Sequence, residues 1–171
     1  LGVNTQEIVN FELDDNATYG DDPIPLEANS TSGLAVQYVS SNSAILEVNG
    51  SSLVIRGTGS ATISAQQPGN VNYDVAPELN ATVTILPAPL QVAAADASKI
   101  FGEAIPTLSY DLEGFVNDEN ASVLGAAPMI QTNAIQTSPA GNYPITVFGG
   151  TADHYLFDYH SATLTITEAA S

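Results

Sequence analysis

Two kinds of side chain in this sequence could do chemistry, acidic pairs and histidines. The acidic pairs are Asp14-Asp15, Asp21-Asp22 and Asp118-Glu119, and the two histidines, His154 and His160, lie close to Asp153 and Asp158. Hydrolysis of a glycosidic bond needs two carboxyl groups about 5–10 Å apart, one of them in an apolar pocket. Adjacent acids in loops rich in glycine and asparagine point apart and stay in water. The sequence therefore predicts no catalytic site.

Metal ions are the other ligand that these side chains could take. Ca²⁺ needs about six to eight oxygen ligands, and Asp14, Asp15, Asp21 and Asp22 all lie in the loop after the first expected strand. Their spacing lacks the dense Asp-x-Asp-x-Asp-Gly pattern of a calcium-binding loop. We therefore expect these four acids to be solvated and no cofactor to be bound, with calcium as the alternative. We likewise expect the histidines to lie in a solvated loop rather than to bind a metal.

The charge balance excludes several partners. Nineteen acidic residues against two basic ones leave a formal charge of −17, so the chain cannot replace the counterions of a nucleic acid. An anionic membrane surface would repel it, and no apolar run approaches the roughly 20 residues of a membrane helix. An acidic surface of this kind suits a secreted protein in salty water, where charges are screened within about 8 Å.

The sequence also contains an internal repeat. Residues of like type recur 82 positions apart: Asp14 and Asp96, Gly20 and Gly102, Leu26 and Leu108, Gly59 and Gly141, Ile63 and Ile145, and Tyr73 and Tyr155. Beyond the tyrosines, residues 80–85 match residues 161–166 at an offset of 81. The chain therefore reads as two tandem domains, 1–86 and 87–171, joined by Leu86-Pro87-Ala88-Pro89, whose prolines predict a short, stiff, extended connector.

Within each copy the hydrophobic pattern has a period of two, which is typical of short β-strands separated by turns. Asn49-Gly50 between two alternating runs predicts a β-hairpin. Only residues 117–124 could form a single helical turn. About seven short strands in roughly 80 residues predict an all-β fold, with an immunoglobulin-like β-sandwich in each copy. With no cysteine or tryptophan in the chain, aliphatic packing must hold each sandwich together.

At this level of detail the second copy resembles a known family. Its Phe101-Gly102-Glu103, Gly114-Phe115-Val116-Asn117, Ala140-Gly141-Asn142-Tyr143-Pro144-Ile145 and Ala162-Thr163-Leu164-Thr165-Ile166 are similar to the MBG, or mucin-binding-like, repeat of bacterial surface proteins. The first copy resembles a bacterial Ig-like repeat, through Tyr38-Val39-Ser40-Ser41-Asn42 and Gly57-Thr58-Gly59-Ser60-Ala61-Thr62-Ile63. These resemblances imply modules of large secreted or surface-anchored bacterial proteins, often adhesins, and no catalytic residues.

Two functional hypotheses follow. In the first, the chain is a non-catalytic extender whose partners are neighbouring repeats of a longer parent protein. In the second, the aromatic residues of the second copy, Tyr155, Phe157 and Tyr159, bind a host or environmental glycan together with His154. The alternation of these aromatics places them on one face of a strand, where they could equally be core. Tyr73 and Tyr155 are expected to close one end of each sandwich with the hydroxyl group facing outward.

Overall fold

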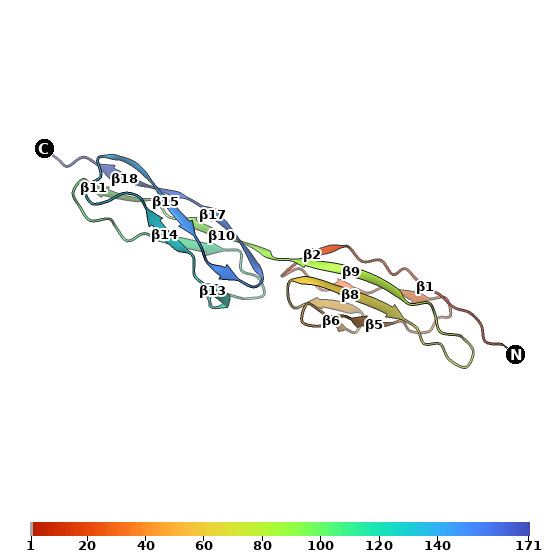
Figure 1. Cartoon of the computed structure of the whole chain (residues 1–171). Coiled ribbons are helices and arrows are strands. Elements are labelled where there is room, and N and C mark those ends of the chain that lie inside the picture. Colours follow the sequence, from red (N-terminus) through yellow and green to blue (C-terminus); the bar gives the residue numbers. More distant parts are fainter. Residues whose placement is uncertain (1) are drawn as a thin grey trace. The chain divides into compact units, whose positions relative to one another are not determined.

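The structure is a computed structural model that describes residues 2–171. It separates into two compact units, Leu1–Pro87 and Ala88–Ser171, and each is a sandwich of β-sheets (Figure 1). Among the described residues, the helical structure is a single 3₁₀ turn, η1 (Ala121–Val123), inside the segment where the sequence predicted one turn. No helix in this part of the chain is long and apolar enough to cross a membrane. The predicted all-β, immunoglobulin-like architecture is thereby confirmed.

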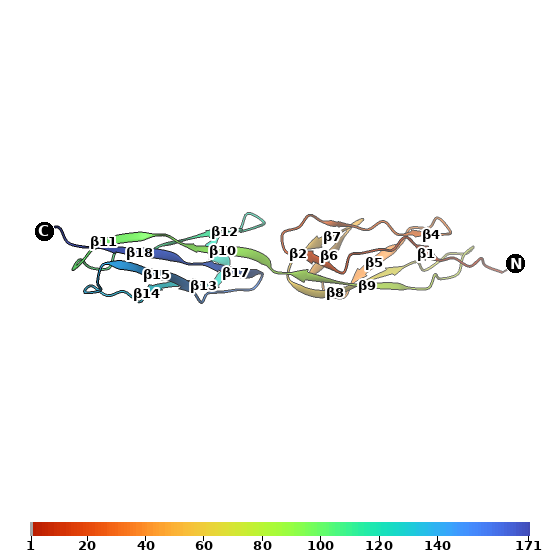
Figure 2. The same cartoon turned by 90° about the horizontal axis from the view of Figure 1, so that it is seen from above.

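The first unit contains a four-stranded and a three-stranded sheet, ordered β2-β9-β8-β5 and β3-β7-β6, and a small sheet of β1 and β4. The strands are β1 (Ile8–Val9), β2 (Asn16–Thr18), β3 (Ile24–Pro25), β4 (Asn29–Ser30), β5 (Gln37–Ser40), β6 (Leu46–Asn49), β7 (Ser52–Ile55), β8 (Gly59–Gln66) and β9 (Leu79–Leu86). Figure 2 shows β7 and β8 on opposite sides of this unit. The predicted hairpin is confirmed, since β6 pairs with β7 and Asn49 lies opposite Ser52.

The second unit repeats the plan with a four-stranded sheet, β11-β18-β15-β14, a three-stranded sheet, β12-β10-β17, and the pair β13 and β16. Its strands are β10 (Ala88–Ala94), β11 (Ala97–Ile100), β12 (Tyr110–Glu113), β13 (Leu124–Ala126), β14 (Met129–Thr132), β15 (Gly141–Phe148), β16 (Thr151–Ala152), β17 (Tyr155–His160) and β18 (Ala162–Thr167). Strand β17 runs parallel to β10 and forms an edge of its sheet.

The four-stranded sheets of the two units have the same register. Gly59 lies opposite Ile85 in the first unit, as Gly141 lies opposite Ile166 in the second. The parallel edge strands agree as well, because Ala17 is paired with Ile85 and Lys99 with Ile166. The offsets of 82 and 81 residues read from the sequence therefore relate these ladders pair by pair.

Aliphatic side chains fill the space between the sheets of each unit. In β8 every second residue from Ala61 to Ala65 is buried, as period-two packing requires. The side chains that are less than 2% exposed are Leu46, Leu53, Ile63, Val83 and Ile85 in the first unit and Leu90, Val92, Ile145 and Leu164 in the second. Each such side chain contributes about 1.5–3 kcal/mol of transfer free energy.

The connector is shorter than the sequence suggested. Strand β9 ends at Leu86 and β10 begins at Ala88, so only Pro87 lies outside a strand. In the first unit the Leu86 carbonyl accepts a hydrogen bond from the Tyr19 amide (2.8 Å), and in the second unit the Ala88 amide donates to the His154 carbonyl (2.9 Å). Ala88 and Pro89 belong to β10 because the parallel ladder with β17 extends to Ala88, which is paired with Tyr155.

Candidate functional site

Strand β17 carries the three aromatic residues of the proposed glycan site. In the ladder with β10, Tyr155 is paired with Ala88, Phe157 with Leu90 and Tyr159 with Val92. Paired residues of a ladder point to the same face of a sheet, and the three partners on β10 are at most 2% exposed. The aromatic side chains therefore lie on the core-facing side of their sheet. Exposure rises along the strand, from 6% at Tyr155 to 40% at Tyr159, on an edge strand that only one neighbour covers.

The aromatic rings contact one another and the loops around β17. Phe115 packs edge-on against Tyr155 with ring centroids 5.4 Å apart, and Phe157 stacks with Tyr159 at 5.9 Å and an interplanar angle of 20°. The Tyr159 hydroxyl donates to the Gly149 carbonyl. The expected outward hydroxyl of Tyr155 is wrong, because it accepts from the Val116 amide (3.1 Å) and bonds the Glu119 carboxylate. Tyr155 thereby fixes the loop before η1.

The histidines lie at the two ends of the same strand. His154 immediately precedes β17, is half-buried, and its carbonyl holds the first residue of β10. At the other end, His160 Nε2 lies 2.9 Å from Asp158 Oδ2, and both side chains are exposed. Residues 158 and 160 alternate with the aromatic positions, so this pair faces away from the aromatic row. The structure thus brings His154 next to Tyr155 in the chain but does not bring His160 into the aromatic row.

The four acids of the alternative calcium site have separate surroundings. The main-chain carbonyl of Asp15 accepts from the Thr84 amide (2.8 Å), and Asp21 Oδ2 accepts from the Thr18 amide (2.8 Å). Asp14 and Asp22 are exposed. Within residues 2–171, no group of three or more histidine or acidic side chains is arranged to hold a metal ion.

Asp21 belongs to a turn that occurs in both units. The Asp21 amide donates back to the Thr18 carbonyl (3.0 Å), and Gly20 between them has φ +96°. In the second unit the Glu103 amide donates to the Ile100 carbonyl (3.1 Å), and Glu103 Oε2 accepts from the Ile100 amide (3.2 Å). One acidic side chain therefore closes each aromatic-glycine turn, which gives Asp21 a structural role.

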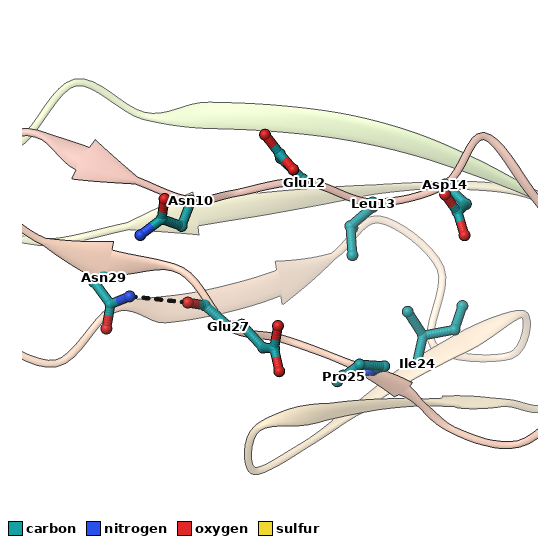
Figure 3. A pocket seen from close by; sticks show the side chains of 8 residues that line it. All are labelled: Asn10, Glu12, Leu13, Asp14, Ile24, Pro25, Glu27 and Asn29. Atoms are coloured by element: carbon teal, nitrogen blue, oxygen red, sulfur yellow. Dashed lines mark hydrogen bonds between the residues drawn. The ribbon is translucent and has the colours of Figure 1, made fainter.

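A polar groove in the first unit was not predicted from the sequence. It has a volume of about 630 Å³ and lies between two segments, residues 10–14 and 24–29 (Figure 3). Its carboxylates come from Glu12, Asp14 and Glu27, while the side chains of Leu13 and Ile24 point toward each other across it. Of its lining residues the sequence analysis singled out only Asp14. The two segments are brought together by strand pairing between β1 and β4, which no local pattern announces.

Comparison with known families bears on the second unit. Residues 90–165 match the MBG domain of the YGX type. The match includes the Phe101-Gly102-Glu103 turn and the whole of β17. The MBG part of the sequence-based resemblance is therefore confirmed. Tyr19-Gly20-Asp21, the corresponding turn of the first unit, lies outside the matched residues.

Solved structures similar to this chain include cadherin fragments. A crystal structure of Drosophila N-cadherin EC1-3 aligns with 97% of this chain and 68% of its own length, at 13% identity and a TM-score of 0.33. The corresponding EC1-4 structure aligns with 95% of this chain and 50% of its own length, also at 13% identity and a TM-score of 0.33. No curated protein sequence matches the chain.

Proposed function

We propose that this chain is a pair of non-catalytic extender modules from a secreted or cell-surface bacterial protein of the adhesin type. Its first module is then a bacterial Ig-like repeat, its second an MBG repeat, and its partners are further repeats of the same parent. One observation supports this proposal above all. The same strand register occurs twice, with a single residue, Pro87, between the last strand of one unit and the first strand of the next.

The connector favours a mechanical role. Proline fixes φ near −65° and has no amide donor, so Pro87 leaves few rotations between two anchored strands. The residues on either side are each bonded within their own unit, Leu86 to Tyr19 and Ala88 to His154. A joint with so little freedom transmits direction from one module to the next. The net charge of −17 would keep neighbouring chains soluble.

Small-angle X-ray scattering tests this extender function. A compact globule of 171 residues would have a radius of gyration of roughly 15–16 Å. We expect a clearly larger value, and we expect Pro87→Gly to broaden the distribution of lengths. Pro77→Gly is the control, because Pro77 lies in an exposed loop of the first unit and its replacement leaves the connector unchanged. A radius near the compact value would overturn the extender proposal.

A glycan-binding function for the second unit is the other candidate, favoured by one observation. Phe157 and Tyr159 stack side by side, and the outer ring is 40% exposed at a sheet edge. Rings presented in this way can pack against a sugar face. Screening on a glycan array decides: binding that Tyr159→Ala abolishes and Leu156→Ala preserves would support this function. Leu156 is the matched control because it is 65% exposed on the opposite face of the same strand. An absence of hits contradicts it.

A further inference from the structure

The acidic residues are distributed unevenly over the two layers of each sandwich. The eight strands of the two four-stranded sheets contain no aspartate or glutamate, and their one charged side chain, Lys99, is buried. Acids occur on strands of the three-stranded sheets instead, at Glu47 on β6, Asp111 and Glu113 on β12 and Asp158 on β17. In a chain of net charge −17, the outer face of each four-stranded sheet is thus uncharged.

In the first unit this face is covered by hydroxyl and amide groups that pair across the strands. Ser60 hydrogen-bonds Thr84 (2.8 Å) and Thr62 hydrogen-bonds Thr82 (3.0 Å), each between the side-chain oxygens of residues opposite each other on β8 and β9. In the next such pair, Ser64 donates to the amide oxygen of Asn80. Polar groups that already have a partner cost less to remove from water than unpaired ones.

The second unit has an equivalent face. Thr165 donates to Asn142 (3.2 Å) at the position that corresponds to Thr84 and Ser60. Apolar side chains add to this face at its β14 edge, where Met129 is 55% exposed opposite Phe148, which is 36% exposed. Both faces therefore combine paired polar groups with some exposed apolar surface, a composition similar to protein–protein interfaces.

From this distribution we propose that the uncharged outer faces of the four-stranded sheets dock against the same faces of a second copy of this chain. The charge distribution selects this occupant. Packed sheets lie about 10 Å apart, so the acids on the outer side of the other layer stay more than one Debye length, about 8 Å in physiological salt, behind the contact plane. Only acids at the strand ends, Asp15, Glu78 and Glu168, lie at the rim of the faces.

The size of the faces predicts the strength of this association. With strands about 4.8 Å apart and a rise of about 3.4 Å per residue, each face measures roughly 370 Å². A standard interface buries about 800 Å² on each partner, so one face alone supports only weak, reversible docking. Two such faces on one chain add to each other by multivalency. The proposal does not depend on the extender function, since it concerns each module by itself.

Sedimentation velocity of the full chain tests the proposal, at protein concentrations from about 10 µM to about 1 mM. We expect reversible self-association that strengthens several-fold between about 0.05 M and 0.5 M NaCl, because salt screens the acids at the rim. The double variant Thr82→Glu/Thr165→Glu places a like charge on each pair of opposing faces and should weaken the association at least about tenfold.

A matched double variant controls for net charge. Asn49→Glu/Leu156→Glu adds the same two charges at exposed positions of the three-stranded sheets, and we expect it to associate like the unchanged chain. Equal loss in the two variants would overturn the proposal, as would a chain that stays monomeric in 0.5 M NaCl. Retention of such a monomer on a neutral polysaccharide matrix would assign the faces to a glycan instead.

Discussion

Lys99 and Arg56 are the two basic residues of the chain, and they lie in opposite surroundings. Arg56 is exposed and pairs with Glu47 (2.6 Å). Lys99 is 6% exposed on β11, where its ammonium donates to the carbonyls of Glu103 (2.7 Å) and Gln136 (3.0 Å). Its counterpart in the first unit is Ala17, in the corresponding pair of the ladder. The lysine therefore holds the Phe101-Gly102-Glu103 turn to a distant loop in the second unit alone.

We expect Lys99→Met to lower the free energy of unfolding by about 2–3 kcal/mol, because two buried carbonyl groups lose their charged donor. Arg56→Met removes the same charge from an exposed pair and should cost less than about 1 kcal/mol. Urea denaturation of both variants measures the difference. Equal effects would show that Lys99 acts through net charge and not through its two hydrogen bonds.

At the scale of elements, the loops of the first unit differ in how much space they leave. Gly33 and Gly69 have nearly the same backbone, with φ of +80° and +78°. A side-chain carbon at Gly33 would meet no atom within 4 Å, whereas at Gly69 it would lie 2.3 Å from the Tyr73 carbonyl oxygen. The Gly69 loop is closed by the hydrogen bond from the Asn70 amide to that same carbonyl (3.0 Å). Glycine is thus required at residue 69 for space as well as for φ.

Gly33→Ala should cost about 1 kcal/mol, the usual penalty for a side chain at positive φ. Gly69→Ala adds a clash with backbone that cannot move without breaking the loop, so we expect a loss of about 3 kcal/mol or more. Thermal unfolding of the two variants, followed by circular dichroism, gives the comparison. Similar melting temperatures would mean that the loop at Gly69 opens at little cost.

At the scale of the whole molecule, each unit has its own set of buried side chains, centred on Ile63 and Ile85 in the first and on Ile145 and Leu164 in the second. We expect residues 1–87 and 88–171, expressed separately, to give β-rich circular dichroism spectra and cooperative melting. The physical reason is that each core lies between sheets of its own unit. If either half is unfolded by itself, the two units do not fold independently.

Net charge gives a second prediction at this scale. Nineteen carboxylates repel one another, so added NaCl should raise the melting temperature by screening. Calcium at millimolar concentration should add nothing beyond its ionic strength, because we expect the four loop acids to be solvated. Differential scanning calorimetry at matched ionic strength checks both expectations. A saturable calcium-dependent rise that Asp21→Asn removes would contradict the second, since asparagine keeps the acceptor for the Thr18 amide.

The sequence by itself determined the strands and the way they recur. Alternating apolar residues in β8 and β15 place one face in a core, and the repeated spacing of Gly59 and Gly141 carries the register from one unit to the other. Local chemistry likewise sufficed for the hairpin between β6 and β7 and for the single turn at η1. These features depend on residues close together in the chain, whose backbone preferences and side-chain period act before any tertiary contact forms.

The tertiary structure alone decided which face of β17 is the core face and which residues meet across the chain. The aromatic row lies on the core side because β17 pairs in parallel with β10, 67 residues away in the register of Ala88 with Tyr155. The hydroxyl of Tyr155 turns inward because the loop at Val116 and Glu119 offers partners there. The groove at Glu12 and Glu27 likewise depends on pairing between distant strands. Such contacts are set by the packing of whole sheets, for which the local sequence carries no period or spacing.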